Sequence, residues 1–199
     1  GTTTSIAPVG GNLLLTSWLD NSVKILDPLT REIVHSIENL NVPVSSAAFK
    51  GFYAVALHGN SSVSLLRTDG SLHKVLSSDF AAPTHVIPYE EGLLVSDRER
   101  GQLIKLFETG ETQVVVDGLT APEGIALFNE TIFVFEGDTG EIKEVKNNII
   151  RTIAKLNGGS TAASSLQPPS MIFNGLALKD GVIYASDEKD RSIYRISLQ

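Results

Sequence analysis

The sequence has no cysteine among its 199 residues, which excludes disulfide bonds and thiolate metal sites. It also has no run of lysine and arginine, and its formal net charge is −7. Nucleic acid and other polyanions require a basic surface, so this balance argues against such partners. No apolar stretch approaches the roughly 18 residues that a membrane-spanning helix needs. We therefore expect a globular protein with neither a nucleic-acid nor a membrane partner.

No secretory signal is present, and the chain opens at Gly1 without Met, which is typical of a processed, trimmed or partial chain. Two Asn-x-Ser/Thr sequons stand at Asn60 and Asn129. They favour a secreted or extracellular protein, with a cytoplasmic location as the alternative.

An internal repeat dominates the sequence. Five segments share one layout, in which an apolar strand, a polar turn of about six residues and an alternating strand follow one another. The residue that opens the alternating strand recurs at steps of 40, 40, 39 and 51, at Val23, Val63, Leu103, Ile142 and Ile193. A short strand precedes each pair, and in the first four repeats another strand follows it. Four antiparallel strands in about 40 residues are typical of a propeller blade, whereas a β-sandwich gives no reason for that period.

The sequence thus predicts an all-β fold, a single β-propeller domain over residues 1–199. The predicted blades span about 1–39, 40–80, 81–119, 120–157 and 171–199. An insertion at 157–170 accounts for the longer last step. The fifth repeat ends after its third strand, which leaves an edge open to pairing. This favours five blades of a six-bladed ring, completed by a segment upstream of Gly1 or by a second chain. A complete five-bladed ring is the alternative.

Propeller geometry predicts which side chains converge. The starts of the innermost strands and the ends of the second strands surround one mouth of the central channel. The residues at strand starts are Thr4, Ser45, Thr84, Glu123 and Asn174. Those at second-strand ends are Ser17, Leu57, Asp97, Glu136 and Asp187, and beside them stand Trp18, His58, Arg98, Gly137 and Glu188. Such oxygen donors suit a hard divalent cation.

Two repeats carry a further pattern. Ala121–Gly137 (APEGIALFNETIFVFEG) and Phe173–Glu188 (FNGLALKDGVIYASDE) resemble the repeat of the SMP-30/gluconolactonase, strictosidine synthase and NHL-type propellers. The shared pattern is Pro-(acidic or Asn)-Gly-(Ile/Leu)-Ala, a turn, and an apolar strand ending in Ser/Ala-Asp. The third repeat keeps the Pro and the Ser-Asp but has Thr84-His85 inside the motif. The resemblance covers these two repeats well and the other three loosely.

The resemblance implies a divalent cation at the channel mouth, Ca²⁺ or Mg²⁺ with Zn²⁺ as a further option, and Glu123 and Asn174 as its ligands. The acidic ligand that the family carries near the N-terminus has no match here, because Thr4 and Ser5 fill that place. The function so implied is a hydrolase of small lactones or esters. In it the cation polarises the carbonyl, and Glu136 or Asp187 takes a proton from the attacking water.

Two other functions stay open. One is a metal-independent enzyme of the strictosidine-synthase type, which condenses or isomerises a natural product through Glu136, Asp187 and His58. The other is a non-catalytic propeller that binds a protein, a sugar or another ligand. For ligand binding the candidates are Thr84, Asp97, Trp18 and Arg98. The alternative role for the aspartates Asp97 and Asp187 is structural, since carboxylates at strand ends commonly accept hydrogen bonds from turn amides.

Overall fold

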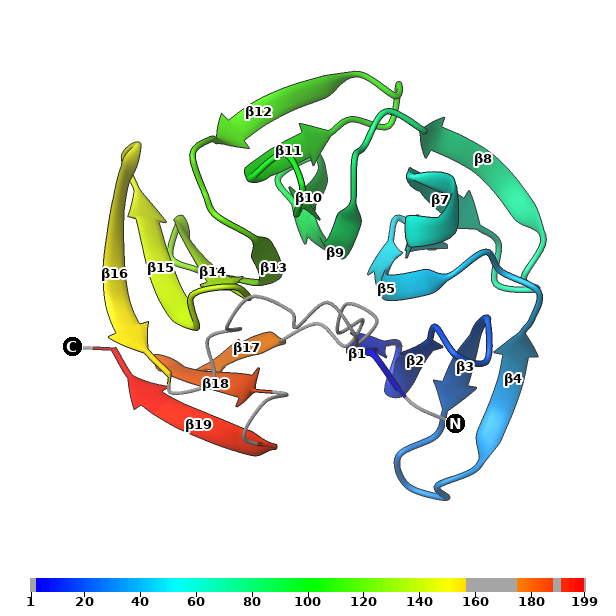
Figure 1. The fold of residues 1–199 in the computed structure, drawn as a ribbon. Helices are drawn as coiled ribbons and strands as arrows, with labels where there is room; N and C mark the ends of the chain where they lie inside the picture. The colour runs from blue at the N-terminus through cyan, green and yellow to red at the C-terminus, as the bar shows by residue number, and fades with distance from the viewer. Residues whose placement is uncertain (1–2, 157–174, 188–190, 199) are drawn as a thin grey trace, which may run out of the picture.

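The computed structural model describes residues 3–156, 175–187 and 191–198 of the chain. This part is all β apart from one 3₁₀ turn, η1 (His58–Asn60). Its strands form five antiparallel sheets around a central axis, as the blades of a β-propeller (Figure 1). The predicted fold class is therefore confirmed, with the five blades that the chain itself forms. The predicted insertion at 157–170 lies outside the described residues.

Four blades have four strands each, which follow one another from the axis outward (Figure 1). The first blade consists of β1 (Ser5–Val9), β2 (Asn12–Ser17), β3 (Ser22–Leu26) and β4 (Ile33–Ile37). The second consists of β5 (Pro43–Phe49), β6 (Phe52–Leu57), β7 (Ser62–Leu66) and β8 (Leu72–Ser77). The third consists of β9 (Pro83–Tyr89), β10 (Gly92–Asp97), β11 (Gln102–Leu106) and β12 (Thr112–Val116).

The last two blades differ in strand number. The fourth consists of β13 (Pro122–Phe128), β14 (Thr131–Glu136), β15 (Glu141–Lys146) and β16 (Ile149–Lys155). The fifth has three strands in the described residues, β17 (Leu176–Lys179), β18 (Val182–Asp187) and β19 (Ser192–Ser197). The outer edge of β19 carries no fourth strand in this part of the chain.

Tight hairpins set the register between the first and second strands of the blades. In four blades both turn residues have positive φ, as in Lys50-Gly51 and Asn129-Glu130. A two-residue turn with this backbone matches the right-handed twist of the strands that it joins. Because side chains alternate along a strand, fixing the register also fixes which residues face each neighbouring blade.

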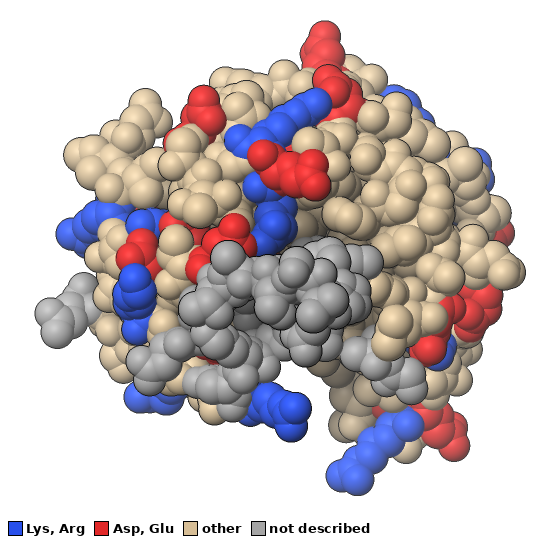
Figure 2. All heavy atoms as spheres, viewed as in Figure 1, with Lys and Arg blue, Asp and Glu red and all other residues tan. Residues whose placement is uncertain are grey.

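The apolar core lies between blades. One cluster of buried side chains joins blades 1 and 2, and others join blades 2 and 3, blades 3 and 4, and blades 4 and 5. In the described residues no such cluster joins blade 5 to blade 1. Ile6 and Ile193 are exposed there, and the outline of the molecule is indented at this place (Figure 2). The described part of the chain contains no helix long and apolar enough to cross a bilayer.

Candidate functional site

The residues that follow the second strands of blades 2, 3 and 4 lie at one face of the propeller. The backbone N–H groups of His58, Arg98 and Gly137 donate to carbonyls of the loops that enter their own blades, each at 2.9 Å. The repeated bond gives these three positions the same place in successive blades. On the face shown in Figure 2, acidic and basic side chains are interleaved, with no broad patch of one sign.

At this mouth Arg98 brings two blades together. Its Nε lies 3.3 Å from Oε1 of Glu123, the second residue of β13, and a terminal nitrogen pairs with Asp138. Glu123 is buried, with a side chain only 5% exposed, whereas the side chains of Arg98 and Asp138 are 32% and 46% exposed. Residues 25 and 40 positions apart thus meet in one cluster, which we call the Arg98 cluster (Arg98, Glu123 and Asp138). It joins a buried carboxylate to a guanidinium that solvent reaches.

Asp97 and Glu136 end the strands β10 and β14, and both carboxylates are buried. Asp97 accepts the N–H groups of Ala81 and Ala82 at 2.9 Å each. Glu136 accepts the N–H of Thr120 at 2.7 Å and lies 3.5 Å from the Lys143 ammonium. Both side chains hold the loop that enters the innermost strand of their own blade. These contacts support a structural role for both carboxylates, which was the alternative role for Asp97. Ligand binding by Asp97 and catalysis by Glu136 stay predictions.

Small hydroxyl side chains on the first and second strands connect neighbouring blades. Thr84 Oγ1 donates to the carbonyl of Pro122 at 3.0 Å, and Ser96 Oγ donates to the carbonyl of Glu123 at 2.7 Å. A hydroxyl–hydroxyl bond of 2.7 Å between blades 1 and 2 does the same. The sequence analysis missed this role, although its signal is visible as Ser and Thr in strands that are otherwise apolar. Thr84 is buried by these contacts, and its predicted ligand binding stays a prediction.

His85 stands where the family motif has glycine. Its Nδ1 accepts the N–H of Ile125 from the next blade at 3.0 Å, so the ring proton is assigned to Nε2. Burial lowers the pKa of the His85 imidazole to about 4, because a charged ring would lose its solvation. His85 is thus neutral at pH 7 and joins the innermost strands of blades 3 and 4.

Four other predicted site residues complete the set. Trp18 lies half-buried in the turn after β2, and half-buried His58 begins η1. Asp187 is buried at the end of β18. Asn174, the second predicted metal ligand, lies outside the described residues. The roles predicted for all four therefore stay predictions.

A divalent cation finds little support in the described residues. No group of three or more His, Cys, Asp or Glu side chains suited to a metal ion occurs among them. Of the two predicted ligands only Glu123 lies in the described part of the chain, and the Arg98 guanidinium pairs with its carboxylate. A metal ion would have to compete with that guanidinium. The divalent cation therefore stays a prediction, because its second predicted ligand, Asn174, lies outside the described residues.

Comparisons with known proteins identify the architecture. No family model matches the sequence, and neither does any curated protein. A gluconolactonase from Xanthomonas campestris superposes with a TM-score of 0.74 and 14% identity over 99% of this chain and 76% of that one. The WD40 propeller domain of Doa1 gives 0.73 and 14% over 100% and 64%, and a streptogramin B lyase gives 0.63 and 12% over 99% and 83%. At such identities the likeness shows the propeller fold alone.

Proposed function

We propose that the protein is a hydrolase of small lactones or esters that acts at the Arg98 cluster. The observation that carries this proposal is the pairing of a buried carboxylate, Glu123, with the partly exposed guanidinium of Arg98 at a channel mouth. Such a pair supplies a proton acceptor and an oxyanion partner side by side. Two of the structurally similar propellers, the gluconolactonase and the streptogramin B lyase, are enzymes by name, which supports the proposal at the level of fold only.

In the proposed reaction, Arg98 donates a hydrogen bond to the carbonyl oxygen of the substrate. As water attacks, negative charge develops on that oxygen, and a fixed guanidinium stabilises it. Glu123 accepts the proton of the attacking water and later returns it to the leaving alkoxide. Arg98 also pairs with Asp138, so it keeps one carboxylate partner when Glu123 becomes protonated. No step of this proposal passes through a metal ion.

A metal-independent condensation or isomerisation of a natural product is the second candidate function. The observation that favours it is again the Arg98–Glu123 pair, because an enzyme of this kind needs an acid–base group but no cation. The two candidates differ in substrate and product. A ring-opened acid or an alcohol is released by the hydrolase, whereas the second enzyme releases a rearranged or coupled product.

The test combines turnover with substitution. Purified protein is assayed with δ-lactones and aryl esters, with and without chelator, and reaction mixtures are analysed by mass spectrometry. We expect hydrolysis that Glu123→Gln and Arg98→Gln each reduce about 100-fold, the size of effect typical of losing an acid–base group or an oxyanion donor. Arg67→Gln is the matched control, since Arg67 is exposed and donates to Ser71 and to the carbonyl of Leu72 in the β7–β8 turn of blade 2.

Unchanged hydrolysis in Glu123→Gln would refute the proposed site. Absence of turnover with all lactones and esters, together with saturable binding of a small molecule, would instead identify a non-catalytic binding propeller. Loss of activity on chelation would show that a cation does take part, and Asn174→Ala would then test the predicted ligand.

A further inference from the structure

The turn of the β13–β14 hairpin lies at the face of the propeller opposite the Arg98 cluster. The strand β13 begins beside that cluster and spans seven residues, so its far end lies roughly 20 Å away. The two turn residues, Asn129 and Glu130, are exposed. Together with Thr131 they form the sequon Asn-x-Thr, in which x is not proline. The side-chain amide of Asn129 is therefore a chemical acceptor for an N-linked glycan.

The backbone of this turn suits an asparagine that carries a bulky group. The angle φ is 44° at Asn129 and 62° at Glu130, as in a type I′ turn. Asparagine is among the residues preferred at the first position of such a turn. Phe128 and Thr131 form the last cross-strand pair and close the hairpin. The Asn129 side chain thus stands at the tip of a closed hairpin, where a glycan meets solvent.

The equivalent position stays exposed in blades whose following neighbour is complete. By register, Lys50 in blade 2 and Glu90 in blade 3 occupy the place of Asn129. Each of these two blades is followed by a blade of four strands. The side chains of Lys50 and Glu90 are nevertheless 48% and 55% exposed. The exposure of Asn129 is therefore a property of its position within a blade.

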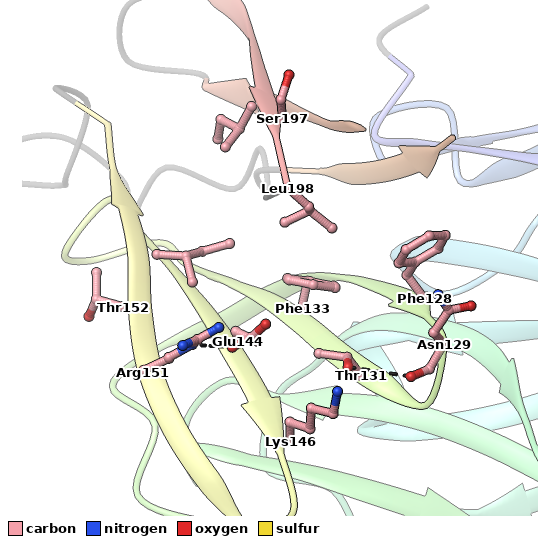
Figure 3. Close-up of a pocket in the computed structure, with 12 residues that line it drawn as sticks. Phe128, Asn129, Thr131, Phe133, Glu144, Lys146, Arg151, Thr152, Ser197 and Leu198 are labelled. Carbon is pink, nitrogen blue, oxygen red and sulfur yellow. Dashed lines mark hydrogen bonds and ion pairs between the residues drawn. The ribbon is translucent and has the colours of Figure 1, made fainter. Parts of the chain in front are cut away.

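An aromatic residue directly precedes the turn in these three blades, namely Phe49, Tyr89 and Phe128. In blade 2 the side chain of Lys50 lies over the Phe49 ring, with Nζ 5.2 Å from the ring centroid. A group on the first turn residue can thus reach the ring before it. Phe128 is partly buried, and it lines the same cavity as Asn129 (Figure 3). The C–H groups on one face of a sugar are slightly positive and are attracted to the negative face of such a ring.

The second sequon, at Asn60, has different surroundings. Asn60 ends η1 at the face of the Arg98 cluster, and its Oδ1 accepts a hydrogen bond from Nδ2 of Asn41. Asn41 also fills the space beside this turn, since a Cβ on Gly59 would overlap its Oδ1. The residue before Asn60 is this glycine and offers no ring to a sugar. The structure therefore favours Asn129 as the acceptor.

We propose that Asn129 carries an N-linked glycan in the secreted protein and that the first sugar packs on the ring of Phe128. The donor is an oligosaccharide joined to a lipid through a diphosphate. A bond forms between Nδ2 of Asn129 and C1 of the first sugar, the bond from C1 to the diphosphate oxygen breaks, and the amide loses one proton. This inference rests on the predicted secreted location and is independent of the proposed enzymatic function.

The test begins with occupancy of the two sequons. Residues 1–199 are expressed in cultured eukaryotic cells behind a heterologous signal peptide, and secreted and intracellular protein are both analysed by intact mass and peptide mapping. We expect a glycan at Asn129 that Asn129→Gln and Thr131→Val each abolish. Thr131→Val removes the hydroxyl that the sequon needs and keeps the shape of a buried side chain. Asn60→Gln is the matched control, and the Asn129 glycan should persist in it.

The contact with Phe128 is tested after the glycan has been trimmed enzymatically to its first sugar. Unfolding of this protein is compared with that of Asn129→Gln, each with Phe128 and with Phe128→Leu. We expect the sugar to lower the unfolding equilibrium constant about threefold to tenfold when Phe128 is present, the size of a stacking contact with an aromatic ring. In the Phe128→Leu background the sugar should have no such effect. Turnover at the Arg98 cluster should be equal with and without the glycan, because the turn lies at the opposite face.

Three results would overturn the proposal. One is an unmodified Asn129 in protein that has entered the secretory pathway, whether secreted or retained. Another is a glycan at Asn60 in place of Asn129. The third is a sugar that stabilises the proteins with Phe128 and with Phe128→Leu equally, which would exclude the contact with the ring.

Discussion

The carboxylate of Glu123 occupies the space that a side chain at position 137 would need. A Cβ on Gly137 would stand 2.0 Å from Glu123 Oε1, a separation that no pair of unbonded atoms tolerates. Gly137 follows the second strand of blade 4, at the position that Arg98 has in blade 3. The absence of a side chain here therefore allows Glu123 to lie at the mouth and to pair with Arg98.

Gly137→Ala is expected to displace the Glu123 carboxylate and to separate it from Arg98. The end of a Glu side chain moves readily, so the free energy of unfolding should fall by only about 1 kcal/mol. Turnover at the Arg98 cluster should fall as far as in Glu123→Gln. In a Glu123→Ala background the same glycine substitution should cost nothing further, because the clash is gone. Chemical denaturation and turnover of the four proteins check this, and additive costs would contradict it.

Asp97→Ala is expected to lower the free energy of unfolding by about 3 kcal/mol, because it leaves one buried and one partly buried N–H group without their acceptor. The N–H groups are those of Ala81 and Ala82. Asp69→Ala removes an exposed carboxylate that accepts the N–H of Ser71 and should cost under about 1 kcal/mol. Urea unfolding measures both. An equally small effect at Asp97 would show that its buried contacts contribute little.

Thr84→Val is expected to lower the free energy of unfolding by about 1–2 kcal/mol, because the carbonyl of Pro122 would lose its donor in a buried place. Val has nearly the shape of Thr, so this change removes the hydroxyl alone, and Thr84→Ser, which keeps the hydroxyl and loses the methyl group, is the control. If Thr84 also binds the ligand, as its position predicts, ligand affinity will fall in Thr84→Val beyond what the loss of stability explains. Calorimetric titration of folded protein separates the two effects.

Stability should decrease as the pH falls from about 6.5 to about 4. The folded-state pKa of His85 is about 4, below its ordinary value of 6.5, so the unfolded chain binds the proton more readily in this window. The resulting loss of stability is on the order of 2–3 kcal/mol at the acid end. His85→Gln can still accept the Ile125 N–H but does not titrate, and its unfolding free energy should depend less on pH. Identical pH profiles for the two proteins would contradict this role.

Carboxylates in ion pairs add a further loss at lower pH. A hydrogen bond from Lys143 holds the pKa of Glu141 below its ordinary value, and one from Lys50 does the same for Glu108. A lowered carboxyl pKa contributes stability that is present above the ordinary value and is lost as the pH falls through the folded-state value. Both proteins in the His85 comparison share this loss, so their difference isolates the imidazole.

The fold was predictable because its signal repeats. Apolar residues such as Val23 and Val63 recur at one step, and each marks the same strand of a successive blade. The topology also predicted that Arg98 and Glu123 lie at one mouth, where the structure pairs them. Period and alternation are properties of the sequence itself, so no knowledge of tertiary contacts was needed to read them.

The roles of individual carboxylates were not predictable in the same way. Asp97 and Glu136 end equivalent strands, but their side chains meet backbone amides of loops about 15 residues earlier in the chain. The direction of a side chain at a strand end depends on the conformation of the loop beside it. A periodic sequence pattern does not predict that conformation. The close approach of the Glu123 side chain to Gly137 could not be predicted from the sequence either, because it depends on where the two backbone segments lie in the fold.

The position of the apolar clusters between blades has a consequence for how the molecule comes apart. In the described residues each blade shares a core only with the blades directly before and after it in the sequence, and blade 5 shares one with blade 4 alone. In such an array stability comes from the contacts between neighbouring blades, so the blade with a single such contact unfolds most readily. Blades 2 and 3 should outlast blade 5 under partial denaturation, and a protease should trim the molecule in steps of one blade.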